Sequence, residues 1–155
     1  MQAHEVGRSD LRIRRAARCL VVSASGRILL FRFDVSDRPP FWVTPGGECD
    51  SHETFEEAAQ RELFEETGLT PASLGEQVAR TAPQFKTIEG EWVQADERYF
   101  LVRVEDETIT TANHTALEQK VMAQHHWFSR AELNEWPEAI FPETLLAILE
   151  TSWPR

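Results

Sequence analysis

Residues 44–69 read TPGGECDSHETFEEAAQRELFEETGL, and they carry the most specific structural signals in the chain. Its second half predicts a helix over residues 55–67. Thr54 and Glu57 form the capping-box pattern that begins a helix, because each side chain can accept a hydrogen bond from the backbone N–H of the other residue. Gly68 suits the left-handed conformation that ends a helix. Before the helix, a short strand predicted over residues 41–44 runs into Pro45-Gly46-Gly47, where the chain turns towards the helix.

One face of the predicted helix is acidic. An i, i+3, i+4 spacing brings Glu62, Glu65 and Glu66 within about 100° of one another around the helix axis. No lysine occurs between Pro45 and Gln84 to pair with them. Carboxylates gathered in this way repel one another, unless a hard cation such as Mg²⁺ lies among them. The alternative is an ordinary exposed acidic stripe, which is common on helices.

The spacing of the whole stretch resembles the Nudix box, G-x5-E-x7-R-E-U-x-E-E-x-G-U, in which U is an aliphatic residue. Every specified position is met, by Gly47, Glu53, Arg61, Glu62, Leu63, Glu65, Glu66, Gly68 and Leu69. A weaker likeness continues through ERYFLVRV at residues 97–104 and Glu118 ahead of HWFS at residues 126–129. The chain is therefore identified as a member of the Nudix hydrolase family. This resemblance implies an α+β fold with a mixed β-sheet sandwiched between helices.

The rest of the chain mixes strands and helices irregularly. Turn residues and β-rich segments predict strands over residues 14–23, 27–33, 41–44, 76–85, 92–104 and 125–128. A second capping box predicts a short helix after Ser129, and Pro142 is expected as the first residue of the final helix. This order favours α+β over a doubly wound parallel sheet. We expect one domain over residues 1–155, with residues 1–12 as a flexible or extended lead-in.

Composition excludes several classes of function. The formal charge is −10, with 26 Asp and Glu against 16 Lys and Arg, so we expect no binding to a nucleic-acid duplex and no processing of RNA ends. No apolar run approaches the roughly 20 residues that span a bilayer, and no secretory signal is visible. Cys19 and Cys49 lack the spacing of a metal site or a disulfide framework, so we expect reduced thiols in a cytoplasmic protein.

The resemblance also implies the chemistry. It implies that water attacks phosphorus in the diphosphate linkage of a nucleotide sugar, ADP-ribose, a dinucleotide or a nucleoside triphosphate. The implied cofactor is Mg²⁺, for which Mn²⁺ can substitute. Its implied ligands are Glu62, Glu65, Glu66 and Glu53, while Arg61 orients carboxylates or contacts the substrate. The expected partner is a small nucleotide, and many family members are homodimers. The alternative is a non-catalytic module that senses a nucleotide, although such domains typically lose box glutamates.

Candidates outside the helix are less specific. Glu118 is the expected general base, because family members often supply one from a loop outside the box, and Glu97 is the second choice. For either residue an exposed carboxylate is an equal alternative. Arg32 is expected to reach a substrate phosphate, unless it is a charge exposed at a sheet edge. Gly46 and Gly47 should allow the backbone to approach the substrate closely.

Aromatic residues and histidines are weaker candidates again. Trp42, Phe85, Trp92 and Tyr99 are candidates to stack on a base, although buried aromatic side chains usually belong to the core. His52, His125 and His126 are candidates for proton transfer or phosphate contact, although exposure to solvent is the more common outcome for such residues.

Overall fold

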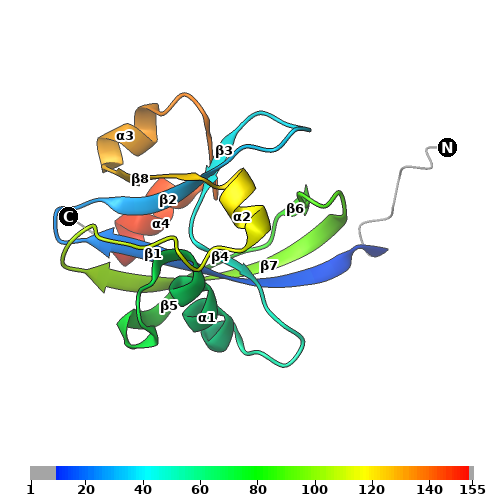
Figure 1. Ribbon diagram of the computed structural model, residues 1–155, viewed down its shortest axis with the longest axis horizontal. Helices are drawn as coiled ribbons and strands as arrows, with labels where there is room; N and C mark the ends of the chain where they lie inside the picture. The colour runs from blue at the N-terminus through cyan, green and yellow to red at the C-terminus, as the bar shows by residue number, and fades with distance from the viewer. Residues whose placement is uncertain (1–9, 154–155) are drawn as a thin grey trace.

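The computed structural model describes residues 10–153, so most of the expected lead-in, residues 1–9, lies outside the described residues. Figure 1 shows a curved sheet with helices on both sides. Its strands are β1 (Arg12–Ser23), β2 (Ile28–Phe33), β3 (Phe41–Val43), β4 (Gly46–Glu48), β5 (Leu74–Thr81), β6 (Gln84–Lys86), β7 (Trp92–Val104), β8 (Gln124–Phe128) and β9 (Ala139–Phe141). The helices are α1 (Phe55–Thr67), α2 (Ala116–Val121), α3 (Arg130–Glu135) and α4 (Leu145–Ser152), with a short 3-10 turn, η2 (Pro71–Ser73).

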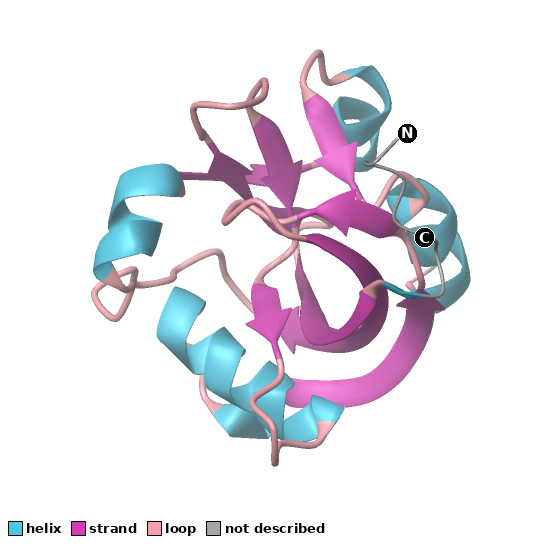
Figure 2. Cartoon of the chain, turned by 90° about the vertical axis from the view of Figure 1, so that its right-hand side faces the viewer, coloured by secondary structure: helices cyan, strands magenta, loops and turns pink. Residues whose placement is uncertain are grey.

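The nine strands found in residues 10–153 form one mixed sheet. Its main path runs β5-β7-β1-β2-β3-β9, while β4 pairs with β1, β6 with β7 and β8 with β2. The long strands β1 and β7 run parallel, from the pair Arg12–Val93 to the pair Ser23–Val104. β1 and β2 form the expected antiparallel hairpin. Figure 2 shows how strongly the long strands curl, so that the sheet offers a different surface to the helices on each side.

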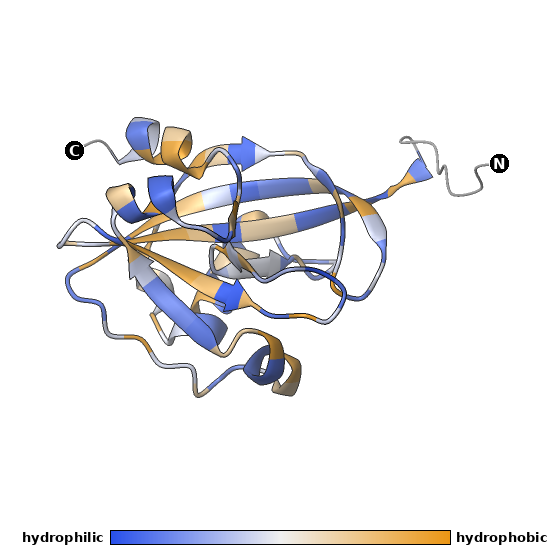
Figure 3. Ribbon diagram, turned by 90° about the horizontal axis from the view of Figure 1, so that it is seen from above, coloured by the Kyte–Doolittle hydropathy of each residue, from blue (hydrophilic) through white to orange (hydrophobic). Residues whose placement is uncertain are grey.

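Successive side chains of each strand point to opposite faces of the sheet, and they form two hydrophobic cores, one on each face. On β1, Ala17, Cys19 and Val21 belong to the core beneath α1, whereas Leu20 and Val22 belong to the core beneath α4. The helices complete these cores with Ala58, Ala59 and Leu63 from α1 and with Leu145 and Leu149 from α4. Figure 3 shows apolar residues along the central strands. We call the two faces of the sheet the α1 side and the α4 side.

The predicted fold class is confirmed, and so is the helix that carries the acidic face. α1 covers the predicted residues, both hydrogen bonds of the Thr54–Glu57 capping box are present, and Gly68 ends the helix with a φ of 77°. The strand predicted over residues 92–104 has those bounds. These elements have short-range signals in the sequence, which is why they could be located without the structure.

Several local predictions need correction. The segment predicted as one strand over residues 76–85 forms two strands, β5 and β6, which both pair with β7. The final helix begins at Leu145 rather than at Pro142, because residues 139–141 pair with β3 as β9. A turn closed by the Leu145 N–H and the Pro142 carbonyl (3.0 Å) then precedes the helix. Strands β4 and β9 and helix α2 were not predicted. No helix within residues 10–153 is long and apolar enough to cross a membrane.

Candidate active site

The orientation of α1 decides which of its carboxylates face the protein. Ala58, Ala59 and Leu63 pack beneath the helix on the α1 side, and this packing places two glutamates at its buried margin. Glu62 is 8% exposed and Glu66 is 3% exposed. Glu65 lies further out, with 40% of its side chain exposed. Because charged glutamates are rarely buried without a partner, the burial of Glu62 and Glu66 indicates a functional role.

Strand β4 approaches these glutamates so closely that it requires glycine. A Cβ on Gly47 would lie 1.9 Å from Glu62 Oε2. Gly46 has a φ of 144°, and a Cβ there would lie 2.1 Å from the Ala17 carbonyl oxygen. The Gly46 N–H donates a hydrogen bond to Glu66 Oε1 (2.9 Å). The glycines therefore hold bare backbone against both carboxylates, although their predicted contact with substrate stays a prediction.

The two buried carboxylates favour their protonated forms. Burial, reinforced by the neighbouring Glu65, raises the pKa of Glu62 to about 7. Burial, together with the charge of Glu62, raises the pKa of Glu66 well above its ordinary value. Two like charges removed from water destabilise each other, and a nearby cation reverses that effect.

Arg61 balances part of this negative charge. Its guanidinium donates to Glu53 Oε2 (2.7 Å) and to Glu62 Oε1 (2.8 Å), with a longer bond to Glu65 Oε1 (3.3 Å). The arginine lowers the pKa of Glu53 to about 2. Glu53 also accepts from the Asp50 N–H (2.8 Å), which ties the preceding loop to the helix. One arginine therefore serves three box carboxylates and cannot neutralise them all.

The cluster fits a hard divalent cation by the chemistry of its donors. Among residues 10–153, no three metal-binding side chains already converge on one point. The carboxylate oxygens bond instead to Arg61 and to the Gly46 N–H. Oxygen ligands from carboxylates are those that Mg²⁺ prefers, and a cation would relieve the repulsion that raises the pKa of Glu62 and Glu66.

Glu118 lies within electrostatic reach of the buried pair. It is the third residue of α2, and its capping box fixes it there: the Thr115 N–H donates to Glu118 Oε1 (3.0 Å), and the Glu118 N–H donates to Thr115 Oγ1 (3.1 Å). The charge of Glu118 contributes to the raised pKa of both Glu62 and Glu66. The structure thus brings this residue to the acidic cluster, and its role as general base stays a prediction.

Glu97 lies on β7 beside an arginine that the sequence did not single out. Glu97 is buried, its Oε1 accepts from the Tyr99 hydroxyl (3.2 Å), and its Oε2 lies 3.7 Å from Arg18 Nη2. Arg18 also donates to the Thr44 carbonyl (3.2 Å), and its charge lowers the pKa of Glu66. The alternation of β1 was the available signal, because it places Arg18 on the same side as Leu20.

His114 is a second residue that sequence reasoning missed. It is buried, and its Nε2 donates to the backbone carbonyl of Glu66 (2.9 Å), because a carbonyl can only accept. The Thr110 N–H donates to the Thr67 carbonyl nearby (2.9 Å). The segment that leads into α2 therefore holds the C-terminal end of α1. A single histidine in a polar loop gives no sequence signal for such a contact.

Arg32 lies elsewhere. Its guanidinium binds Glu138 through two hydrogen bonds, of 3.0 Å and 2.8 Å. Glu138 also accepts from Trp42 Nε1 (2.8 Å). Trp42 belongs to the core beneath α4, so this cluster lies on the α4 side, away from the face that carries α1. The predicted contact between Arg32 and a substrate phosphate stays a prediction, and its donors are engaged in this structure by a carboxylate.

The remaining candidates are dispersed. Among the aromatic residues, Tyr99 is buried in the core and Trp92 is 57% exposed. Of the histidines, His52 is exposed, His126 lies 3.1 Å from a carboxylate oxygen of Glu132, and His125 packs against an aromatic ring. None of these contacts connects to the glutamate cluster, so none strengthens the corresponding prediction.

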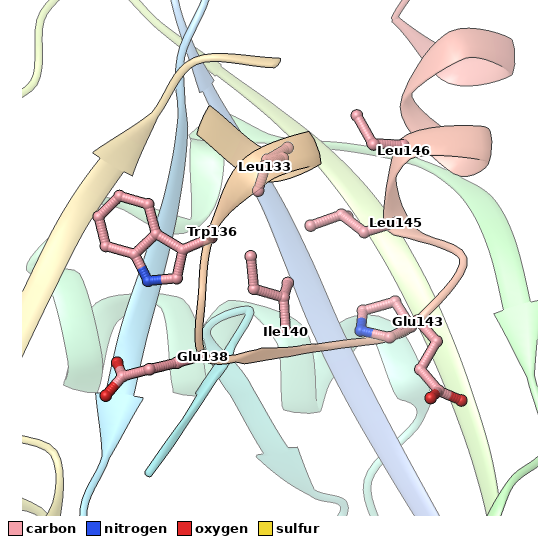
Figure 4. Close-up of a pocket in the computed structure, with 8 residues that line it drawn as sticks. Leu133, Trp136, Glu138, Ile140, Glu143, Leu145 and Leu146 are labelled. Carbon is pink, nitrogen blue, oxygen red and sulfur yellow. The ribbon is translucent and has the colours of Figure 1, made fainter. Parts of the chain in front are cut away.

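A separate hollow of about 240 Å³ opens between α3, β9 and α4 (Figure 4). Its lining includes Leu133, Trp136 and Ile140 together with Leu145 at the start of α4. These residues pack with the core on the α4 side. The hollow is therefore not the place where the acidic residues of α1 gather.

Comparison with known proteins agrees with this geometry. The family model described as NUDIX domain matches residues 12–147. A putative 8-oxo-dGTP diphosphatase of Bacillus subtilis (strain 168) is 48% identical over 54 residues, 34% of each chain. An RNA pyrophosphohydrolase of Erythrobacter litoralis (strain HTCC2594) is 35% identical over 80 residues, 52% of this chain and 48% of that protein. The chain therefore spans about a third to a half of the length of these curated relatives.

A solved structure extends the likeness over most of the chain. The MutT protein from Methanosarcina mazei Go1 matches with a TM-score of 0.67 and 19% sequence identity, over 91% of this chain and 93% of that chain. At this identity the likeness shows the fold alone.

Proposed function

The chain belongs to the NUDIX domain family, and we propose that it is a Mg²⁺-dependent hydrolase of the diphosphate linkage in a nucleoside diphosphate derivative. The observation that carries the proposal is the buried pair Glu62 and Glu66, held against glycine backbone with raised pKa values. Such a pair weakens the fold by itself, and it becomes favourable when a cation and a phosphorylated ligand bind.

Glu62, Glu65 and Glu66 would hold the metal, for which Mn²⁺ can substitute, with Glu53 positioned behind them by Arg61. When bound, the metal supplies positive charge that neutralises the diphosphate and lowers the pKa of water. Arg61 keeps the carboxylates oriented through its planar fork.

Glu118 accepts the proton of the attacking water in this proposal. Its capping box uses Oε1, and Oε2 remains to receive the proton. The water attacks phosphorus, the bond between that phosphorus and the bridging oxygen breaks, and the two phosphorylated products leave.

The test is a hydrolysis assay on the purified protein with Mg²⁺ and a panel of nucleotide sugars, ADP-ribose, dinucleotides and nucleoside triphosphates. Phosphate released after coupling to a phosphatase measures turnover, and Glu66→Gln serves as the inactive control. Mg²⁺-dependent turnover that collapses in the variant supports the proposal. Nucleotide binding without turnover across the panel would overturn it in favour of a nucleotide-sensing module.

The setting proposed for this activity is the cytoplasm, with a small nucleotide as partner and a homodimer as the assembly. Cys19 and Cys49 are both free and buried, as is expected in a reducing compartment. Sedimentation of the purified protein would decide the proposed dimer.

A further inference from the structure

Two arginines lie on one face of β1 with only a small residue between them. Arg14, Ala16 and Arg18 alternate along the strand, so their side chains share the side of the sheet that faces away from α1. Ala16 is fully buried and leaves no side chain to separate the two guanidinium groups. The arginine side chains are 17% and 14% exposed. Two cations in this position repel each other, and Glu97, which pairs with Ala16 across the β1–β7 ladder, supplies one carboxylate 3.7 Å from Arg18. One buried carboxylate between two guanidinium groups leaves a net positive charge, which favours a further anion.

Arg14 is incompletely paired among residues 10–153. Its Nη1 is shielded from solvent, and within residues 10–153 it has no hydrogen-bond acceptor. Its Nε lies 3.5 Å from Glu48 Oε1, while the other oxygen of Glu48 accepts a 2.6 Å bond from Arg12. Burial, and after it the charge of Arg18, lowers the pKa of Arg14. A buried guanidinium N–H without an acceptor is costly, and an incoming anion would satisfy it.

Arg18 connects this pair to the glutamate cluster. It pairs with Gly46 across the β1–β4 ladder, and a Cβ on Gly46 would lie 2.9 Å from Arg18 Cδ. The Gly46 N–H is the group that donates to Glu66. One short strand of bare backbone therefore separates the cationic pair from the carboxylates. Phe85 lies beyond Arg14, with its ring centre 5.9 Å from the guanidinium carbon.

We propose that Arg14 and Arg18 form an anion subsite for the terminal phosphate of a nucleoside 5′-triphosphate. The inference rests on the proposed function, in which the glutamate cluster holds the diphosphate that is cleaved. A third phosphoryl group carries up to two further negative charges, which two guanidinium forks can bind together. A nucleotide sugar or ADP-ribose has no such group. The subsite thus selects triphosphates among the candidate substrates.

The experiment compares Arg14→Gln with Arg80→Gln in the full chain. Arg80 is an exposed arginine that pairs with Asp96, so its variant removes the same charge from outside the subsite. Isothermal titration with Mg²⁺ measures the binding of non-hydrolysable analogues of ATP and of ADP-ribose, in which a methylene group replaces the α,β-bridging oxygen and which share the same nucleoside. We expect Arg14→Gln to raise the dissociation constant of the triphosphate by about tenfold or more, and that of the ADP-ribose ligand by less than about twofold. Arg80→Gln should match the wild type for both ligands.

The proposed subsite would be refuted if Arg14→Gln weakened the binding of both ligands equally or left the binding of the triphosphate unchanged. It would also be refuted if the wild type did not bind the triphosphate. Because the readout is binding, wild-type protein that hydrolyses nothing would refute the proposed function while the contrast between ligands still decides the subsite. Thermal unfolding accompanies the titration and checks that Arg14→Gln, which loses the contacts with Glu48 and Phe85, is folded at the temperature of the titration. If that variant fails to fold, Arg14→Lys replaces it. We expect Arg14→Lys to bind the triphosphate more weakly than the wild type does, and to bind the ADP-ribose analogue with nearly unchanged affinity.

Discussion

Two clusters of charged side chains in this molecule differ in how well their charges are balanced. On the α4 side, Glu138 faces Arg32 in a two-bond ion pair and also accepts from Trp42, and these partners lower its pKa to about 2. On the α1 side, burial raises the pKa of Glu62 to about 7 and raises that of Glu66 as well. Glutamate therefore favours its charged form on the α4 side of the sheet, and its protonated form is favoured on the α1 side.

This contrast distinguishes a cluster that stabilises the fold from a cluster whose charges are balanced only when a ligand binds. Glu138 is partly exposed to solvent and accepts hydrogen bonds from Arg32 and Trp42, so its charge is well compensated. Glu62 shares Arg61 with Glu53 and Glu65, whereas Glu66 accepts a hydrogen bond from the Gly46 N–H. Glycine backbone lies directly against both carboxylates. Groups with strongly perturbed pKa values gather at functional sites, where binding of a ligand offsets their cost to stability. An unbalanced set of buried charges therefore indicates function better than burial alone.

The largest expected effect comes from removing one charge of the unbalanced cluster. Glu62→Gln should lower kcat/KM for the best substrate by about 10²–10³-fold, because a charged group that stabilises the transition state is lost. The same variant should raise Tm of the metal-free protein, since one of two repelling carboxylates becomes neutral. Coupled phosphate release and calorimetry measure the two effects. A variant that loses both activity and stability would contradict the contrast between the clusters.

Removing the shared cation should give the next largest effect. Arg61→Met leaves Glu53 and Glu62 without their principal donor. We expect a loss of about 2 kcal/mol in the free energy of unfolding without metal, together with a fall of about tenfold or more in kcat/KM. Urea unfolding with and without Mg²⁺ checks the first, and added Mg²⁺ should recover part of the stability. Recovery by Mg²⁺ that is no greater than in the wild type would contradict this account.

The pH dependence of stability offers a smaller and more continuous test. The folded-state pKa of Glu62 lies above its unfolded value of 4.5, so the folded protein binds the extra proton. Its contribution is fully present below pH 4.5 and is lost as pH rises through about 7, by at most about 3 kcal/mol. Urea unfolding in EDTA from pH 4.5 to pH 8 should show this fall, and Mg²⁺ should stabilise the protein more at pH 8 than at pH 5.

The control for that measurement is Glu62→Gln. Burial lowers the pKa of His125, so this histidine makes stability rise with pH up to its unfolded value of 6.5, opposite to the effect of Glu62. The difference between the wild type and the variant isolates the carboxylate. A variant whose stability falls with pH as steeply as that of the wild type would assign the fall to other groups.

The contacts within each cluster could be predicted from the sequence only where the two residues are close together along the chain. The box helix, its caps and the convergence of Glu62 with Glu66 follow from spacings of three to eight residues, and the structure has them as predicted. The partner of Arg32 is 106 residues away, and His114 reaches the Glu66 carbonyl across 48 residues. The first contact depends on how β2, β3 and β9 pair, and the second depends on how the segment before α2 lies against α1. No local pattern in the sequence specifies either arrangement.

The smallest expected effect concerns the balanced cluster. Arg32→Met and Glu138→Gln, singly and combined, should each lower Tm by no more than about 4 °C, because both side chains remain partly exposed. The double variant should lose less than the sum of the single losses, since each residue alone leaves the other unpaired. If Arg32 also binds a substrate phosphate, Arg32→Met should raise KM while Glu138→Gln frees the guanidinium and does not. An unchanged KM in both variants would assign Arg32 to the fold alone, whereas a loss of kcat comparable to that of Glu62→Gln would erase the distinction between the two clusters.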